Sequence, residues 1–284
     1  NRRHINEEKL NLALVDLLDS YHLFRLPKFW GDGKHAAADG TKYDLSEQNL
    51  MAEYHIRYGG YGGIAYHHVS DLYVALFSHF INCGTWEAVY IIDGLLKNDS
   101  EIQPDTLNAD TQGQSTTVFG LSYLLGIKLQ PRIRNVKDLI FYRAEKGKKF
   151  KHIDALFSET IDWDLIQTHW QDLMQVVLSI KVGKILPSTL LRKLGNYSRR
   201  NRLYFAFREL GRVIRTIFLL KYISDKDFRE EINANTNKVE AYNGFSKWLN
   251  FGGEILQEND PEEQEKLIKY NTLVANALIF QNVI

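Results

Sequence analysis

The chain has 284 residues with 35 basic and 35 acidic side chains, so its formal net charge at pH 7 is zero and gives no overall sign of a polyanionic partner. This length can bury a substantial core in one large domain or two modest ones, and no apolar run approaches the roughly 20 residues that span a bilayer, so no membrane partner is expected. Cys83 is the sole cysteine, which excludes an internal disulfide and is typical of a reducing compartment such as the cytoplasm.

The first elements alternate between helical and extended patterns. Apolar residues recur at helical spacing over 6–24 and predict a helix that ends before Pro27. Residues 35–75 predict three strands, and the glycines at 59–63 indicate a hairpin turn, because no helix start follows them directly as a phosphate-binding loop would require. The apolar run over 72–97, which contains Cys83, predicts one helix or two abutting helices.

The middle of the chain continues with a strand over 106–110, a helix over 116–125 that Gly126 stops, and a strand over 128–133 that Pro131 places at a sheet edge. The order of strands and helices predicts an α/β sheet with an antiparallel start. Beyond residue 137 the strand signals fade and helical patterns dominate. Helices are predicted over 165–180, 190–197, 203–220, 228–249 and 262–279.

Basic residues are concentrated in two segments. Residues 181–221 hold eleven bases and one acid, Glu209, and residues 128–151 hold nine bases and two acids. Such asymmetry allows a polyanion to bind one face electrostatically, although solvated helix faces give the same pattern. Within and near these segments, the candidate DNA-contacting residues are Arg132, Arg134, Arg192, Lys193, Arg199, Arg200, Arg212 and Lys238.

Three acidic residues stand where a metal-dependent site could form. Asp39 ends the first predicted strand, Asp110 ends the fourth, and Glu240 lies on a late helix at the border of its apolar stripe. Mg²⁺ prefers oxygen ligands, and two ions held by converging carboxylates can activate an attacking oxygen and stabilise a leaving one. Spacing alone does not single out these three among the 35 acids.

Local motifs around these acids resemble those of the Tn-three family of replicative transposases. The resemblance covers nearly the whole chain after residue 35, and it is the ordered set that is specific, because no single motif is. The motifs are Ala38-Asp39-Gly40, Tyr66-His67-His68-Val69-Ser70-Asp71, Glu87 to Leu96, Asp110-Thr111-Gln112-Gly113, Val118-Phe119-Gly120-Leu121, Leu124-Leu125-Gly126, Pro131-Arg132-Ile133, Ser179 to Gly183, Leu191 to Leu194, Glu209-Leu210-Gly211-Arg212 and Asn237-Lys238-Val239-Glu240-Ala241.

This resemblance implies an RNase H-like α/β fold with a long all-α insertion between the second aspartate and the glutamate. Asp39, Asp110 and Glu240 would be the DDE triad, 71 and 130 residues apart, with Mg²⁺ as cofactor and Mn²⁺ as a substitute. The implied activity is cleavage at transposon ends and attack of the freed 3′-hydroxyls on target DNA. The implied partners are both DNAs and a second copy of the chain, and the expected location is the bacterial cytoplasm, at the nucleoid when bound to DNA.

The resemblance also suggests a division of the chain. Residues 1–34 would be a helix and linker to an upstream region that recognises the terminal repeats, 35–136 the first part of the catalytic core, 137–222 the helical insertion, and 223–284 the last part of the core. Four positions depart from the family pattern. Ala37-Ala38 and Thr41 flank Asp39-Gly40 where other residues are frequent, and His67 stands where a smaller hydroxyl residue is frequent, which leaves its supporting role open.

Alternative roles for single residues have less support from the sequence. Adjacent histidines such as His67 and His68 point to opposite faces of a strand, which disfavours a shared zinc ion. Ser70 with His68 and Asp71 occupies too short a run for a nucleophilic triad. Asp93 could be a fourth carboxylate or a structural residue at a helix end, and we favour the latter. At the level of function, the alternatives to a transposase core are an RNase H-like nuclease without strand transfer and a non-catalytic DNA-binding assembly module.

Overall fold

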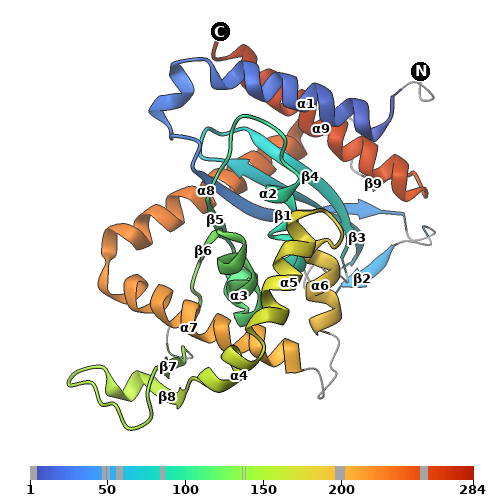
Figure 1. The fold of residues 1–284 in the computed structure, drawn as a ribbon. Helices are drawn as coiled ribbons and strands as arrows, with labels where there is room; N and C mark the ends of the chain where they lie inside the picture. Colours follow the sequence, from blue (N-terminus) through green and yellow to red (C-terminus); the bar gives the residue numbers. More distant parts are fainter. Residues whose placement is uncertain are drawn as a thin grey trace. The chain divides into compact units, whose positions relative to one another are not determined.

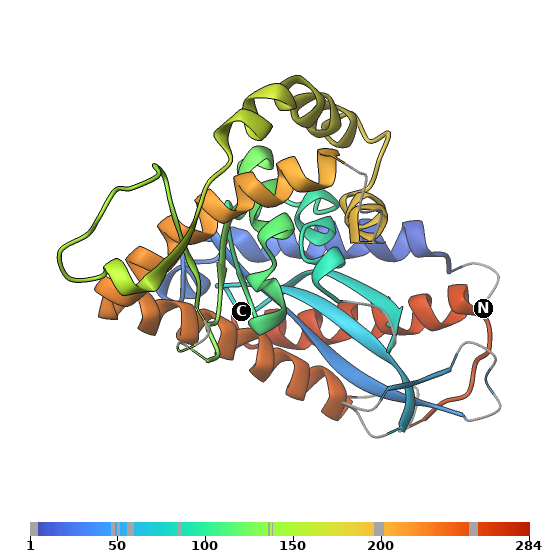
Figure 2. The same cartoon turned by 90° about the horizontal axis from the view of Figure 1, so that it is seen from below.

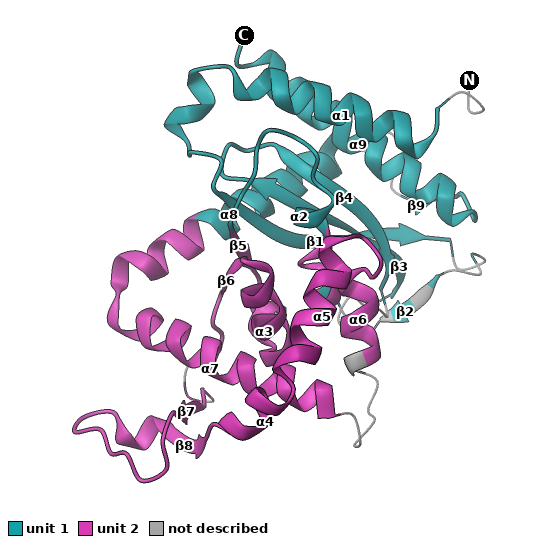
Figure 3. Ribbon diagram, in the orientation of Figure 1, with its two compact units in different colours: residues 1–87, 94–105, 235–284 teal, residues 88–93, 106–234 magenta. Residues whose placement is uncertain are grey.

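The computed structural model describes residues 5–46, 49, 52–55, 60–83, 87–135, 137, 139–195, 202–249 and 255–284. Their contacts divide the chain into two compact units, each assembled from separate stretches of sequence (Figure 3). The first unit contains residues 1–87, 94–105 and 235–284, and the second contains residues 88–93 and 106–234. The chain therefore leaves the first unit and returns to it for its last fifty residues.

A mixed sheet forms the centre of the first unit (Figures 1 and 2). Its middle strand β3 (Gly60–Ser70) pairs antiparallel with β1 (His35–Leu45) along one edge. Along the other edge, β3 pairs antiparallel with β2 (Glu53–His55) over its first residues and with β4 (Ala75–Asn82) over the rest. The short strand β9 (Ile255–Leu256) runs parallel to the end of β1. The antiparallel start that the sequence predicts is confirmed.

Helix α9 (Pro261–Gln281) and the part of helix α8 (Lys226–Leu249) that belongs to the first unit pack on one face of this sheet. Alternate residues of a strand point to opposite faces, so Asp39 shares this face with the buried Ala37. A buried apolar cluster joins the strands to the helices and consists of Ala37, Val69, Ala75, Val239, Tyr242 and Ala275. The helix predicted over 262–279 is confirmed as α9, whose start is capped by Asp260, which accepts from the Glu262 amide at 2.9 Å.

The N-terminal helix α1 (Glu7–His22) matches the predicted helix and packs against α9, where the rings of Tyr21 and Phe280 lie 6.3 Å apart. The Tyr21 hydroxyl donates a 2.9 Å hydrogen bond to the Leu72 carbonyl. Three short helices complete the first part of the chain: η2 (Leu26–Phe29), η3 (Glu87–Tyr90) and α2 (Asp93–Leu96). Among the described helices, none has both the length and the apolar character needed to cross a membrane.

The second unit is built around two parallel strands and their connecting helix. β5 (Thr106–Ala109) pairs in parallel with β6 (Lys128–Pro131), and η4 (Thr111–Gln114) and α3 (Thr116–Leu125) join them. Helix α3 ends at Gly126, whose φ of 85° is a left-handed conformation that glycine adopts without strain. The remaining elements are β7 (Phe141–Arg143), η6 (Asp154–Leu156), β8 (Phe157–Thr160), α4 (Trp163–Thr168), α5 (Trp170–Lys181), α6 (Pro187–Gly195) and α7 (Arg202–Ser224).

Helices α3 and α7 approach each other through glycine. A Cβ atom at Gly120 would lie 2.5 Å from the Phe207 carbonyl oxygen, so no larger residue fits without moving α7. Gly120 belongs to one of the motifs that carry the family resemblance, and Gly211 on α7 belongs to another. Close helix packing therefore gives these two motifs a structural reason.

Four predictions about elements are wrong. Asp39 does not end the first strand, because β1 continues to Leu45. Gly60, Gly62 and Gly63 do not form the predicted turn, because they lie within β3 and pair with β2 or β4. The run over 72–97 is not a long helix: it contains β4, η3 and α2, and Cys83 is buried at the end of β4. A short, continuously apolar run fits a buried strand as well as a helix, which explains the error. The segment 137–222 is mainly helical but not all-α, because β7 and β8 form a two-stranded parallel sheet within it. Three or four residues are too few to show an alternating pattern.

Candidate active site

Asp39 lies in the middle of β1, on the sheet face that α8 and α9 cover. Its side chain is half-buried, and in the sheet register it stands opposite His67 of β3. Gly40 follows on the other face, where a Cβ atom would approach Ile64 Cγ2 to 2.5 Å. The pair Asp39-Gly40 thus combines an accessible carboxylate with a residue that must lack a side chain.

Glu240 is exposed on α8, and Asn243 follows it by three residues. Residues three apart on a helix are neighbours on the same surface. The Asn243 side chain is buried, and its Nδ2 donates a 3.3 Å hydrogen bond to Asp39 Oδ2. A Cβ atom at Gly244 on the same helix would meet nothing within 4 Å. The helix turn that carries Glu240 is therefore hydrogen-bonded to the strand that carries Asp39.

His67 completes this arrangement from β3. Its Nδ1 lies 2.9 Å from Asn243 Oδ1, and its Nε2 lies 3.4 Å from the Thr272 hydroxyl. Burial lowers the His67 pKa to about 4, while the hydrogen bond with Asn243 opposes this shift. The ring is therefore neutral at pH 7. Because Asn243 directs its NH₂ group at Asp39, its oxygen faces His67, and Nδ1 carries the proton.

Asp110 belongs to the second unit and comes directly after β5. Its side chain is half-buried, and its backbone carbonyl accepts from the Gly113 amide at 3.1 Å, which begins η4. Next to it, the Arg132 amide donates to the Ala109 carbonyl at 2.8 Å, just after β6. Asp110 thus stands at the carboxyl ends of two parallel strands, a common position for functional residues in α/β proteins.

The three predicted carboxylates are divided between the units: Asp39 and Glu240 lie in the first and Asp110 lies in the second. Within the described ranges, no three His, Cys, Asp or Glu side chains lie close enough together to hold a metal ion. The convergence of all three acids therefore stays a prediction. Their chemistry does suit Mg²⁺, because each offers carboxylate oxygens, which this hard ion prefers.

Comparison with known proteins shows the family. The family model described as the Tn3 transposase DDE domain matches residues 1–284. The chain belongs to this family. The resemblance found in the sequence motifs is confirmed over the full chain.

Several members of the Tn3 transposase group are similar to the chain along almost its whole length. This chain is 32% identical over 281 residues to the transposase for transposon Tn1546 of Enterococcus faecium, and the match covers 98% of this chain and 28% of that protein. It is 30% identical over 285 residues to the transposase for transposon Tn501 of Pseudomonas aeruginosa, covering 99% and 29%. The gamma-delta transposase of Escherichia coli (strain K12) is 30% identical over 287 residues, covering 100% and 28%. The chain spans less than a third of these relatives.

Four candidate DNA-contacting residues of this DDE domain make contacts within the chain, among them Lys238, Arg212 and Arg192. Lys238 donates 2.9 Å hydrogen bonds to the backbone carbonyls of Trp30 and Asp71, and burial lowers the Lys238 pKa. Arg212 forms ion pairs of 2.8 Å with Glu209 and 3.1 Å with Glu159. The third, Arg192, donates to the Tyr90 hydroxyl and stacks over that ring.

The remaining candidates differ in exposure. Arg132 is half-buried and donates to the Asn233 carbonyl at 3.2 Å, whereas Arg134 and Lys193 are exposed. Arg199 and Arg200 lie outside the described residues. Arg134 and Lys193 are therefore the best placed of the described candidates to meet a phosphate group in solution.

Asp93 has the structural role that we favoured. Its buried carboxylate accepts from the Ser188 amide at 2.9 Å and from the Ser188 hydroxyl at 2.6 Å. Ser188 lies in the first turn of α6, where amide groups have no partner within the helix. Asp93 therefore acts as a cap for α6.

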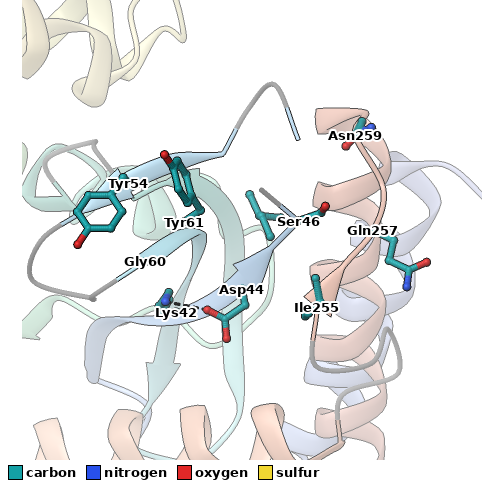
Figure 4. A pocket seen from close by; sticks show the side chains of 10 residues that line it. Lys42, Asp44, Ser46, Tyr54, Gly60, Tyr61, Ile255, Gln257 and Asn259 are labelled. Atoms are coloured by element: carbon teal, nitrogen blue, oxygen red, sulfur yellow. Dashed lines mark ion pairs between the residues drawn. The ribbon is translucent and has the colours of Figure 1, made fainter. Parts of the chain in front are cut away.

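A hollow of about 960 Å³ opens at the end of β1 in the first unit (Figure 4). Its lining includes the exposed rings of Tyr54 and Tyr61, 5.6 Å apart, and the ion pair of Lys42 with Asp44 at 2.7 Å. The Asp44 carboxylate offsets the positive charge of Lys42, which would otherwise attract a phosphate group. Within the part of the chain that the structure describes, the hollow is lined by neither the predicted carboxylates nor the candidate DNA-contacting residues.

Proposed function

We propose that the chain is the catalytic core of a DDE transposase, with Asp39, Asp110 and Glu240 as the carboxylates that hold its metal ions. The main observation is the hydrogen bond from Asn243 to Asp39, which brings the helix turn of Glu240 to the strand of Asp39. Membership of the Tn3 transposase DDE domain family supports this assignment, because the family name itself refers to a DDE domain.

We further infer that the core has an RNase H-like fold. Three antiparallel strands, β1, β3 and β4, come first, and a parallel pair joined by a helix, β5 and β6, follows. The late helix α8 then carries Glu240 to the sheet face of Asp39. This order of elements is the one that the RNase H-like interpretation requires.

The proposed reaction is phosphoryl transfer on DNA. Mg²⁺, or Mn²⁺ in its place, would activate the attacking oxygen and stabilise the leaving oxygen when bound by the three carboxylates. The chain would cleave the 3′ ends of the terminal inverted repeats and join them to target DNA in the replicative, cointegrate-forming mode. Its partners would be transposon-end DNA, target DNA and a second copy of the chain, because two ends must be joined in concert.

A strand-joining assay tests this proposal. The purified chain is incubated with Mg²⁺, a pre-cut transposon end bearing a free 3′-hydroxyl, and a supercoiled plasmid, and the joined product is measured. Asp110→Asn should abolish joining while the melting temperature and DNA binding stay as in the wild type. Asp164→Asn, at an exposed aspartate of the same unit, is the matched control and should join normally.

Each alternative function predicts a different result in this assay. Hydrolysis of the DNA without a joined product would indicate a nuclease that lacks strand transfer. Absence of Mn²⁺ binding together with absence of any cut would indicate a non-catalytic DNA-binding module. Unchanged joining by Asp110→Asn would contradict the assignment of Asp110.

A further inference from the structure

Asn243 connects three functional elements of the first unit through one side chain. It follows Glu240 by one helical turn on α8, contacts Asp39 on β1 at 3.3 Å, and contacts His67 on β3 at 2.9 Å. With 5% of its surface exposed, it is buried, and a buried amide must satisfy both its oxygen and its NH₂ group. Both ends of this amide have hydrogen-bond partners in the site.

The orientation of the amide follows from these two partners. A carboxylate accepts hydrogen bonds and does not donate, so the NH₂ end of Asn243 must face Asp39. The oxygen then faces His67 Nδ1, which donates to it. A reversed amide would bring its oxygen against the Asp39 carboxylate, with two acceptors in contact. His67 therefore fixes the direction in which Asn243 presents its donor.

We propose that Asn243 is a positioning residue that orients the Asp39 carboxylate for metal binding, and that His67 in turn orients Asn243. This inference rests on the proposed function, because it assumes that Asp39 is a metal ligand. It also gives a role to His67, one of the positions at which the sequence departs from the family pattern.

A second helix, α9, also contacts His67. The Thr272 hydroxyl on α9 lies 3.4 Å from His67 Nε2 and 2.8 Å from the Ile268 carbonyl oxygen. With the proton on Nδ1, Nε2 can only accept, so the single Thr272 hydroxyl proton is donated either to Nε2 or to the Ile268 carbonyl. The chain of contacts runs from α9 through β3 and α8 to β1. Hydrogen-bond partners that orient a metal ligand typically change metal affinity or activity by roughly 10–100-fold when they are removed.

The test measures binding of Mn²⁺ alone to the full chain, by the loss of the free Mn²⁺ signal in electron paramagnetic resonance, together with thermal unfolding. Asn243→Ala should weaken Mn²⁺ binding roughly 10–100-fold. Asn271→Ala is the matched control: Asn271 is also buried, and it donates to the Ser246 hydroxyl and carbonyl at 2.8 Å on the same layer of helices. It should lower the melting temperature and leave Mn²⁺ affinity unchanged.

Two further variants keep the proposal testable if Asn243→Ala does not fold. His67→Asn places an amide donor near the position of Nδ1 and should retain most of the Mn²⁺ affinity. His67→Leu removes the donor and should weaken Mn²⁺ binding, because Asn243 is then free to rotate. Equal affinities for these two variants would overturn the role of His67.

Asp39→Ala separates this inference from the proposed function. If Asp39→Ala loses Mn²⁺ binding while Asn243→Ala binds within about twofold of the wild type, the positioning role is wrong and the proposed metal site stands. If Asp39→Ala binds Mn²⁺ as tightly as the wild type, the proposed metal site is wrong, and the positioning role is overturned with it.

Discussion

Gly211 on α7 lies directly against the backbone of Thr116 on α3. A Cβ atom at Gly211 would stand 1.6 Å from the Thr116 carbonyl oxygen, and backbone atoms cannot move aside as a flexible side chain can. The two helices can pack this closely only because position 211 has no side chain. This contact places a strict constraint on the core of the second unit.

Gly211→Ala should therefore destabilise the protein. Overpacking of a tight core costs roughly 1–3 kcal/mol, and the gain in helix propensity from glycine to alanine offsets about 1 kcal/mol at most. Urea unfolding measures the difference. Gly244→Ala is the matched control on a helix, because a Cβ atom there meets nothing within 4 Å, and it should stabilise the protein slightly. A fully stable Gly211→Ala variant would contradict the close contact.

The metal-holding role of all three acids can be mapped directly. Fe²⁺ that replaces Mg²⁺ generates hydroxyl radicals with ascorbate and peroxide, and these cut the backbone next to the ion. We expect cuts near residues 39, 110 and 240, all of which should disappear in Asp39→Asn. Mass spectrometry of the fragments gives the positions. Cuts near 39 and 240 without a cut near 110 would show that Asp110 is not a ligand of the same ion.

The neutral state of His67 predicts how stability depends on pH. The folded pKa of about 4 lies below the unfolded value of about 6.5, so the unfolded chain binds a proton that the folded chain excludes. Stability should be fully present above about pH 6.5 and decline as pH falls toward 4, by on the order of 3 kcal/mol in total.

His67→Asn is the control for this prediction, because it does not titrate. Glu265 and His68 influence His67 electrostatically, and they are retained in both proteins, so the difference between the two stability curves isolates His67. Urea unfolding at a series of pH values supplies these curves. Parallel curves for His67→Asn and the wild type between pH 4 and 6.5 would show that His67 is not the group responsible.

Measurements of DNA affinity should distinguish the exposed basic residues from those that make contacts within the chain. Arg134→Ala and Lys193→Ala should each weaken DNA binding and reduce the slope of log K against log salt by about 0.9. Arg212→Ala should instead lower stability by roughly 1–3 kcal/mol, since it removes the 2.8 Å ion pair of the buried Glu209. Fluorescence anisotropy and urea unfolding measure the two effects. Similar salt slopes for all three variants would contradict this division.

The sequence predicts much of the architecture because several elements carry local signals. Helix α1 shows clear periodicity, α3 ends at Gly126 and α9 begins at Pro261, and all three were expected within a few residues. Strand β4 was not expected as a strand. When both faces of a strand are covered, apolar and polar residues do not alternate along it. Tertiary contacts, not local propensity, decide the structure of such a run.

The candidate site shows the same limit. Motif resemblance predicts Asp39 and Glu240 as site residues, but nothing in the sequence pairs Asn243 with Asp39, from which it is separated by more than two hundred residues. Asn243 lies one helical turn after Glu240, and this spacing in the sequence already indicates that the two residues share a helix surface. Likewise, no sequence pattern shows that Lys238 and Arg212 make intramolecular contacts, because their charges look the same whether they face solvent or an internal carbonyl.

The cover of the central sheet has a consequence for synthesis of the chain. Ala37, Val69 and Ala75 are buried by Val239, Tyr242 and Ala275, which are translated more than 160 residues after the last of these three strand positions. At about 5–20 residues per second, the apolar face of the nascent sheet remains uncovered for roughly 10–30 s. Throughout this time Asp39 lacks its partner on α8, so the proposed cutting site cannot be assembled until translation has passed residue 243.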